Sequence, residues 1–237
     1  MGARLLLGSY ALAMAELLGA EYFGNRIIAQ ADGAEVEAQT LNKRLASGLE
    51  GREPVAVILD DSSAVWPHDR RNLLVAERYV WFPTVRTRGR GSLLDAGRDD
   101  CPRTGMLAAV TRTLDRIHTQ VFARIAARAP QDEWDARAVM DATRRRVLAG
   151  ARVAFSRVIP LEADPRSHPL WRLAEQYGGV CEGAVGWGTT HVVATHGGTE
   201  KVMWAKEHGK FVVSPAWLEC SCILWARADE RRFPLPQ

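Results

Sequence analysis

Apolar side chains follow a helical period in the middle of the chain. They recur every three or four positions, as on one face of an amphipathic helix: Met106, Val110, Leu114, Ile117, Val121 and Ile125. We expect this helix to end near Pro130, because proline cannot continue it, and a second helix to cover about residues 134–146. The preceding residues 84–103 are rich in arginine, glycine and proline, which predicts a loop.

The C-terminal third alternates short apolar runs with helical segments. Gly178 and Gly179 are placed to end one helix, and Thr199 is placed to cap the next. In chain order we predict a first strand from 147–148 and 153–155, helix 169–177, strand 190–194, helix 199–208, strand 211–213 and a helix from Pro215. This alternation is typical of a compact α/β unit with a parallel sheet.

The first hundred residues contain one strong strand signal. The run 55–59 is wholly apolar, as in a strand buried in a parallel sheet, and it leads directly into Asp60 and Asp61. Ligands of open α/β sheets bind beyond the carboxyl ends of the strands. Two adjacent carboxylates there are costly unless they hold a cation or take part in chemistry. The pattern therefore predicts a metal-dependent site, of the kind that transfers phosphoryl groups.

The other N-terminal patterns are weaker. We expect a helix at 9–18, a short strand region at about 22–28, the end of a helix at 41–47, and extended segments at 73–76 and 79–82.

Composition places the chain among ordinary globular proteins. It has 237 residues, of which 47% are hydrophobic and 25% charged, enough for one large or two small domains. A net charge of +3 is too small to indicate nucleic-acid binding, although 144–146 is either a local phosphate-binding patch or a solvated helix end. No apolar run is long enough for a membrane span. Cys220-x-Cys222 lacks a second cysteine pair at metal-site spacing.

The C-terminal unit resembles a BRCT domain over residues 146–234. The features that carry the resemblance are Gly178-Gly179, Thr190-His-Val-Val193, Thr199-x-Lys201, Phe211-Val-Val-Ser-Pro215 and Trp217. The resemblance implies a four-stranded parallel sheet flanked by helices. Trp217 has a packing role in that fold.

Many BRCT domains bind phosphoserine peptides, and the matching pocket positions here are Ser156, Thr199 and Lys201. A hydroxyl donor, a helix N-terminus and a cation would then converge on one phosphate dianion. One position departs from the family pattern, because Arg157 stands where the pocket usually has glycine. Its side chain either blocks the backbone approach or adds a phosphate contact, and Lys201 is otherwise a solvated helix charge.

A second resemblance covers nearly the whole chain. The RNA polymerase II carboxy-terminal-domain phosphatases that carry a BRCT domain, and the plant-type phosphatase-like proteins in particular, are similar to this sequence in the order of its parts. The matching segments are Tyr10-Ala11, Lys43-Arg-Leu45, Val57-Ile-Leu-Asp-Asp61 with Val65-Trp-Pro67, Asn72-Leu73 and Glu77-Arg-Tyr79. The resemblance implies an α/β fold: a haloacid-dehalogenase-like, Rossmannoid parallel sheet, then a helical linker and a BRCT domain.

The family's mechanism implies roles for three residues. Lys43 matches the lysine that neutralises charge on the nucleophile and the phosphate, and it counts as the catalytic candidate. Asp60 and Asp61 match the acidic pair that helps to hold Mg²⁺, with Asp60 nearest to the metal and Asp61 supporting it or binding Lys43. Mg²⁺ would shield the charges that repel a phosphoserine dianion.

The sequence departs from the family where the nucleophile belongs. No Asp-x-Asp-x-Thr or Asp-x-Asp-x-Val motif occurs before Asp60, and the first aspartate of the chain is Asp32. We therefore expect residues 1–100 to be a partial phosphatase domain without its first strand, 101–145 to be a helical linker and 146–234 to be the BRCT domain. The chain is then either a fragment of an active phosphatase or a short paralogue, and in both cases it is expected to be inactive alone.

Two functions stay open at this point. The first is the C-terminal portion of a Mg²⁺-dependent protein-serine/threonine phosphatase that acts in the nucleus on the phosphorylated C-terminal repeats of RNA polymerase II. The second is a non-catalytic BRCT module that binds phosphopeptides or a transcription factor. Neither function implies direct nucleic-acid binding or membrane association.

Overall fold

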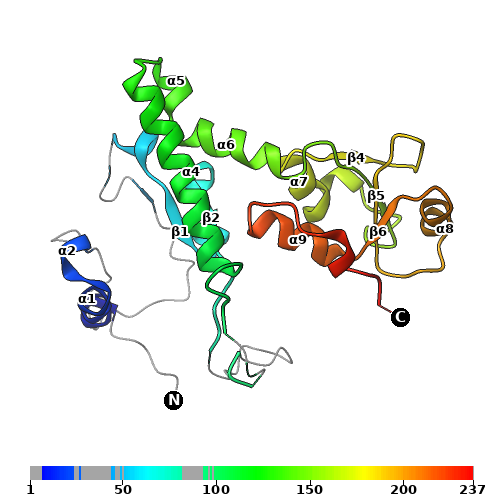
Figure 1. The fold of residues 1–237 in the computed structure, drawn as a ribbon, viewed down its shortest axis with the longest axis horizontal. Coiled ribbons are helices and arrows are strands. Elements are labelled where there is room, and N and C mark those ends of the chain that lie inside the picture. The colour runs from blue at the N-terminus through cyan, green and yellow to red at the C-terminus, as the bar shows by residue number, and fades with distance from the viewer. Residues whose placement is uncertain are drawn as a thin grey trace.

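The computed structural model places the BRCT-like unit and the Asp60 strand on either side of a helical bridge (Figure 1). It describes residues 7–23, 27, 44–45, 49, 51–81, 93–95, 97 and 99–236. The long helix α4 (Met106–Ala126) lies left of the centre of the view, and α6 (Ala136–Val147) runs from beside it toward the C-terminal unit (Figure 1). Within the described ranges, no helix has the length and apolar character needed to cross a membrane.

The N-terminal segment is helical. Helix α1 covers Leu7–Leu18, which confirms the helix expected at 9–18. Gly19 follows with φ +104, a left-handed conformation that favours glycine and ends the helix. The expected strand at 22–23 is wrong, because the chain forms the short helix α2, Ala20–Phe23, in which Tyr22 N donates to Gly19 O at 3.1 Å.

The Asp60 strand belongs to a parallel pair. Strand β1 is Ile58–Asp60 and strand β2 is Leu73–Val75, with Ile58 opposite Leu73 and Asp60 opposite Val75. The strand therefore begins later than the apolar run predicts, because Glu53–Val55, with Pro54 in its first turn, forms a 3₁₀ helix. The expected extended segment at 79–82 is not a strand over its described residues 79–81.

Three helices connect this pair to the C-terminal unit. They are α4 at Met106–Ala126, α5 at Gln131–Trp134 and α6 at Ala136–Val147, so the predicted long helix is confirmed. Asp100 accepts hydrogen bonds from Met106 N at 2.8 Å and Leu107 N at 3.0 Å, which satisfies free donors at the start of α4. Asp135 likewise accepts from the backbone N–H of Arg137 at the start of α6.

The C-terminal unit is a four-stranded parallel sheet, as predicted. Its strands are β3 at Arg152–Ser156, β4 at Val180–Glu182, β5 at His191–Ala194 and β6 at Phe211–Val213, in the spatial order β4-β3-β5-β6. The helices are α7 at Pro169–Gln176, α8 at Glu200–Glu207 and α9 at Pro215–Ile223. Strand β4 has no counterpart in the sequence prediction, and Val147-Leu148 is the end of α6 rather than part of the first strand.

The alternation of side chains along β3 and β5 separates two helical layers. Val153, Phe155 and Val193 pack with α7 and α9, whereas Ala154 and Val192 pack with α8 on the opposite face. Successive strand side chains point to opposite faces, so this pattern follows directly from the sequence. Ser156 ends β3 at the same carboxyl edge where α8 begins.

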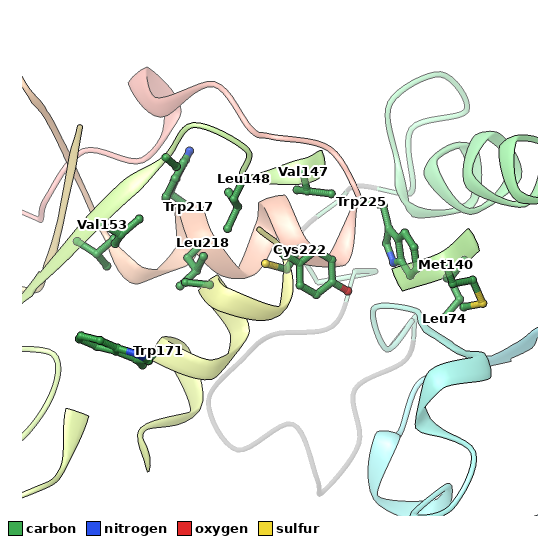
Figure 2. Close-up of a cluster of buried hydrophobic side chains, with 14 of the residues drawn as sticks. Leu74, Met140, Val147, Leu148, Val153, Trp171, Trp217, Leu218, Cys222 and Trp225 are labelled. Carbon is green, nitrogen blue, oxygen red and sulfur yellow. The ribbon is translucent and has the colours of Figure 1, made fainter. Parts of the chain in front are cut away.

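The larger core crosses the boundary between the two halves. Leu74 of β2 and Met140 of α6 belong to the same buried cluster as Trp171, Trp217 and Trp225. Figure 2 shows Leu74 and Met140 at one end of this cluster, next to Trp225, with Val153 and Trp171 at the other. The helices expected to form a linker therefore share one apolar core with the BRCT-like unit.

Candidate functional site

Two of the three predicted phosphate-binding residues are in direct contact. Ser156 is buried at the carboxyl end of β3, and Thr199 is the N-cap of α8. Their hydroxyl oxygens, Ser156 Oγ and Thr199 Oγ1, lie 2.7 Å apart, while Thr199 Oγ1 also accepts from Val202 N at 3.4 Å. The start of α8 supplies positive partial charge, which favours an anion at this point.

Lys201 lies at the same carboxyl edge. Its Nζ donates to Phe155 O at 3.1 Å and to Gly183 O at 2.7 Å. Partial burial lowers the pKa of the Lys201 ammonium, because removal from water disfavours its charged form. An ammonium has three N–H donors, so one donor is not used by these two carbonyls. The structure therefore places Lys201 beside the end of β3 that carries Ser156, at the edge where Thr199 begins α8.

Arg157 has a backbone conformation that favours glycine. Its φ is +57, in the left-handed region, where a non-glycine residue costs about 1–2 kcal/mol. Its carbonyl accepts from Thr195 Oγ1 at 3.0 Å, and its side chain is exposed. The departure from the family pattern thus leaves the turn after β3 in the glycine-like form, with a guanidinium added at the surface.

Asp60 is fixed by two hydrogen bonds at the end of β1. Its Oδ1 accepts from Ser62 N at 2.9 Å, and its Oδ2 accepts from the indole Nε1 of Trp66 at 3.0 Å. Strand β2 supports the same residue from its other side, where Ala76 N donates to Asp60 O at 3.0 Å. The tryptophan of the Val-Trp-Pro motif therefore orients the Asp60 carboxylate.

Asp61 pairs with a residue that the sequence analysis did not assign. Its Oδ2 lies 2.6 Å from Arg78 Nε, at an exposed position. This hydrogen bond raises the pKa of the Arg78 guanidinium above its ordinary value. In the sequence, Arg78 belongs to the Glu77-Arg-Tyr79 segment that follows β2. Lys43, one of the two partners expected for Asp61, lies outside the described residues.

The acidic pair offers the donor chemistry that Mg²⁺ prefers. Mg²⁺ is held by hard oxygen ligands, commonly one or two carboxylates together with waters and substrate phosphates. Asp60 and Asp61 supply two carboxylates at the carboxyl end of a parallel strand. Across the described ranges, no group of three or more His, Cys, Asp and Glu side chains is placed to hold a metal. The chemistry of the pair therefore fits part of a magnesium site.

The arginine run at 144–146 is not a phosphate-binding patch as a whole. Arg145 and Arg146 are exposed, but Arg144 is buried with 3% of its surface accessible. Its Nη2 donates to Leu73 O at 2.8 Å, so the run is not simply a solvated helix end either.

Comparison with known proteins supports the fold described above. The signature of the BRCA1 C Terminus (BRCT) domain family matches residues 163–221. The fission yeast RNA polymerase II CTD phosphatase Fcp1, solved with beryllium fluoride bound, superposes with a TM-score of 0.68 over 97% of this chain and 73% of that chain. Their sequences are 22% identical, so the likeness concerns the fold. The fold class is α/β, with a haloacid-dehalogenase-like part followed by a BRCT domain.

Two curated relatives from Arabidopsis thaliana are similar to nearly all of this chain. RNA polymerase II C-terminal domain phosphatase-like 3 is 39% identical over 95% of this chain and 19% of its own length. Phosphatase-like 4 is 36% identical over 97% of this chain and 52% of its own length. Over nearly its whole length, the chain is therefore similar to RNA polymerase II C-terminal domain phosphatase-like proteins. It spans about a fifth of one relative and about half of the other.

Proposed function

We propose that this chain is part of a protein-serine/threonine phosphatase that dephosphorylates the C-terminal domain of RNA polymerase II. The observation that carries the proposal is 39% identity to phosphatase-like 3 over 95% of the chain. The acidic pair at the carboxyl end of β1 supports it. The substrate is inferred from the names of the relatives, which are longer than this chain. Its proposed partners are the phosphorylated C-terminal repeats, and its proposed location is the nucleus.

Within such an enzyme, Asp60 and Asp61 would hold Mg²⁺, and Lys43 would neutralise charge near the phosphate. Bound Mg²⁺ supplies electrostatic stabilisation of the transferring phosphoryl group. Asp60 is oriented for this part by Ser62 N and Trp66 Nε1, and Arg78 restrains Asp61. These contacts support a role as the metal side of a phosphatase centre.

We further propose that this polypeptide alone does not hydrolyse phosphoserine, because it contains no Asp-x-Asp-x-Thr or Asp-x-Asp-x-Val motif. Hydrolysis in this superfamily requires a nucleophilic aspartate from that motif. The test is phosphate release from phosphoserine heptad peptides in the presence of Mg²⁺. The chain and its Asp60→Asn variant should both stay at the blank rate, and release by the chain that Asp60→Asn abolishes would contradict the proposal.

A chimera tests the phosphatase assignment itself. The chain would replace its matching segment in phosphatase-like 4, so that the half of that relative outside the match is retained. We expect the chimera to release phosphate and its Asp60→Asn counterpart to lose at least about a hundredfold in rate, in line with removal of a key charge from a phosphoryl-transfer site. An equal rate of phosphate release by both chimeras would show that Asp60 is not part of the active site.

A second candidate function is phosphopeptide binding by the BRCT domain. The observation that favours it is the 2.7 Å contact between Ser156 Oγ and Thr199 Oγ1 at the start of α8, with Lys201 at the same edge. Hydrogen bonds to charged groups contribute about 1.5–3 kcal/mol. Replacement of Lys201 by methionine should therefore weaken binding of a phosphoserine heptad peptide by roughly tenfold to a hundredfold.

The matched control is Lys206→Met, an exposed lysine in the last turn of the same helix. It removes the same charge from α8 at the end remote from Ser156. We expect Lys206→Met to bind the peptide with an affinity close to that of the unaltered chain. Equal affinity for phosphorylated and unphosphorylated peptide, or an equal loss in both variants, would exclude the pocket.

A further inference from the structure

Arg144 is a buried cation that α6 carries between the two halves of the molecule. Its residue surface is 3% accessible, and its Nη1 pairs with Asp141 Oδ1 at 2.8 Å. A buried charge is strongly unfavourable unless it is paired and its donors are hydrogen-bonded. The groups that contact the Arg144 guanidinium therefore show which parts of the fold this residue connects.

On one side, Arg144 binds the backbone of the Asp60 strand pair. Its Nη2 donates to Leu73 O at 2.8 Å and, more weakly, to Arg71 O at 3.4 Å. Asp141 reinforces the contact, because its Oδ2 also pairs with Arg71 Nη2 at 2.9 Å. Leu73 lies opposite Ile58 in the strand pair, so the guanidinium holds the strand that supports Asp60.

On the other side, Arg144 packs on aromatic residues of the BRCT domain. Its guanidinium carbon lies 4.9 Å from the ring centroid of Trp225, which is buried just after α9. Trp225 in turn makes an edge contact with Tyr177 at 5.9 Å, at the end of α7. A cation over a tryptophan face is attracted by the ring electrons, and the attraction is stronger where water is excluded.

A continuous path of contacts therefore runs from the BRCT domain to the acidic pair. It passes from Trp225 through Arg144 to Leu73 O, and along β2 to Ala76 N, which donates to Asp60 O at 3.0 Å. The apolar core follows the same route, because Leu74 and Met140 belong to the buried cluster that contains Trp225 (Figure 2).

We propose that Arg144 is a positioning residue that locks the Asp60 strand pair onto the BRCT domain. The strand pair and the BRCT sheet then open together rather than as two independent domains. In this view α6 connects the Asp60 strand pair rigidly to the BRCT domain. Arg144 adds a hydrogen bond on the strand side and a tryptophan contact on the BRCT side to the apolar packing of α6.

The test is amide hydrogen exchange of the full chain, measured by mass spectrometry with residue resolution, for Arg144→Met and Arg145→Met. Arg145 is the matched control, because it is the adjacent arginine on α6 and is exposed. We expect amides at 58–60 and 73–76 to exchange roughly tenfold faster or more in Arg144→Met, since a buried acceptor loses its donor. Amides of β3 and β5 should change much less, and Arg145→Met should match the unaltered chain.

A difference in exchange rate at 58–60 and 73–76 of less than about twofold between the two variants would overturn the proposal. Equal acceleration of exchange in β3 and β5 would also overturn it, because a general loss of stability accelerates all amides together. Arg144→Lys keeps the charge and one donor for Leu73 O but loses the planar fork. We expect it to restore part of the protection at 73–76, and no restoration relative to Arg144→Met would count against the hydrogen bond to Leu73.

A measurement on the unaltered chain covers the case in which Arg144→Met does not fold. Exchange would be followed at increasing urea concentrations below the unfolding transition. We expect the strand-pair amides and the β3 and β5 amides to merge into one denaturant-dependent opening. Strand-pair amides that open at low urea, with the BRCT amides still closed, would show that no lock exists. None of these outcomes depends on phosphate binding or hydrolysis.

Discussion

The two parallel sheets of this protein differ in how completely their neighbours cover them. The BRCT sheet has four strands with helices on both faces, and its central residues Val153, Val192 and Val193 are fully buried. The strand pair that carries Asp60 has two strands over the described residues, and Leu59 in β1 is 49% exposed. One sheet is thus a complete framework, whereas the other depends on contacts made by α6.

This difference bears on function, because each sheet carries a candidate site at its carboxyl edge. Ser156, Thr199 and Lys201 are held by a closed framework of strand ends and a capped helix. Asp60 and Asp61 are held by local contacts with Trp66 and Arg78. We therefore expect substitutions in the BRCT core to have large effects and substitutions around the acidic pair to have small ones.

The largest effect is expected for Trp217→Ala. Trp217 is fully buried, donates from Nε1 to Ala228 O at 3.0 Å, and stacks on His191 with ring centroids 4.5 Å apart. Removing a buried tryptophan costs about 3–5 kcal/mol in the free energy of unfolding, which urea denaturation measures. Trp187→Ala is the control, because Trp187 is 81% exposed, and similar losses in both variants would contradict the predicted core.

A smaller loss is expected for Leu74→Ala in the strand pair. Leu74 is fully buried against the core that α6 shares with the BRCT domain. We expect a loss of about 2–3 kcal/mol, toward the lower part of the range for such substitutions, because the less covered strand pair can relax around the cavity. Leu59→Ala on the paired strand should cost much less. If Leu59→Ala were as destabilising as Leu74→Ala, the difference in burial between these two leucines would not account for the stability of the strand pair.

The next effect concerns pH and the buried His191 in β5. Burial lowers the pKa of His191, while its hydrogen bond with Glu230 acts in the opposite direction. Because the folded pKa lies below the unfolded value of about 6.5, the unfolded chain binds more protons as the pH falls. The stability contribution is therefore complete above about pH 6.5 and is lost as the pH decreases toward the folded pKa.

Thermal melts between pH 8 and pH 5 measure this contribution. His191→Gln should flatten the pH dependence of the melting temperature in this window, and His196→Gln, at an exposed position, should leave it unchanged. A melting temperature of the unaltered chain that rises between pH 6.5 and pH 5 would contradict the sign.

The smallest effect is expected for Arg78→Ala. The Arg78–Asp61 ion pair is exposed, and such pairs contribute less than about 1 kcal/mol because water and salt screen them. Urea denaturation in low and high salt should show a small loss that added salt reduces. Arg70→Ala, another exposed arginine of the same region, is the control. A loss larger than that of Leu74→Ala would mean that Arg78 holds the strand pair more strongly than its exposure indicates.

Much of the BRCT domain was predictable from sequence, because its elements carry local signals. The strand at 153–155, the helix cap at Thr199 and the helix begun by Pro215 follow from side-chain period, capping and proline geometry. Strand β4 was missed because it is a three-residue edge strand whose alternation is too short to detect. Val147-Leu148 was misassigned because an apolar pair is compatible with either a strand or a helix end.

The acidic pair illustrates the limit of such predictions. The adjacent carboxylates after an apolar run indicated a strand end, and Asp60 does end β1. The partners of Asp60 and Asp61 are set by folding, as Trp66 and Arg78 reach them through turns. Arg144 shows the same limit more strongly, because its acceptor Leu73 O lies 71 positions away in sequence. No pattern among the neighbouring residues in the sequence indicates that an arginine will be buried in this way.

The most direct test of the contrast between the two sites is an amide NMR titration of the full chain with a phosphoserine heptad peptide in the presence of Mg²⁺. We predict chemical-shift changes centred on the amides of Ser156, Thr199 and Lys201, none at 60–62, and none anywhere with the unphosphorylated peptide. Shift changes confined to 60–62, with the amides of the BRCT pocket unmoved, would contradict the proposal that this chain recognises phosphate through its BRCT domain.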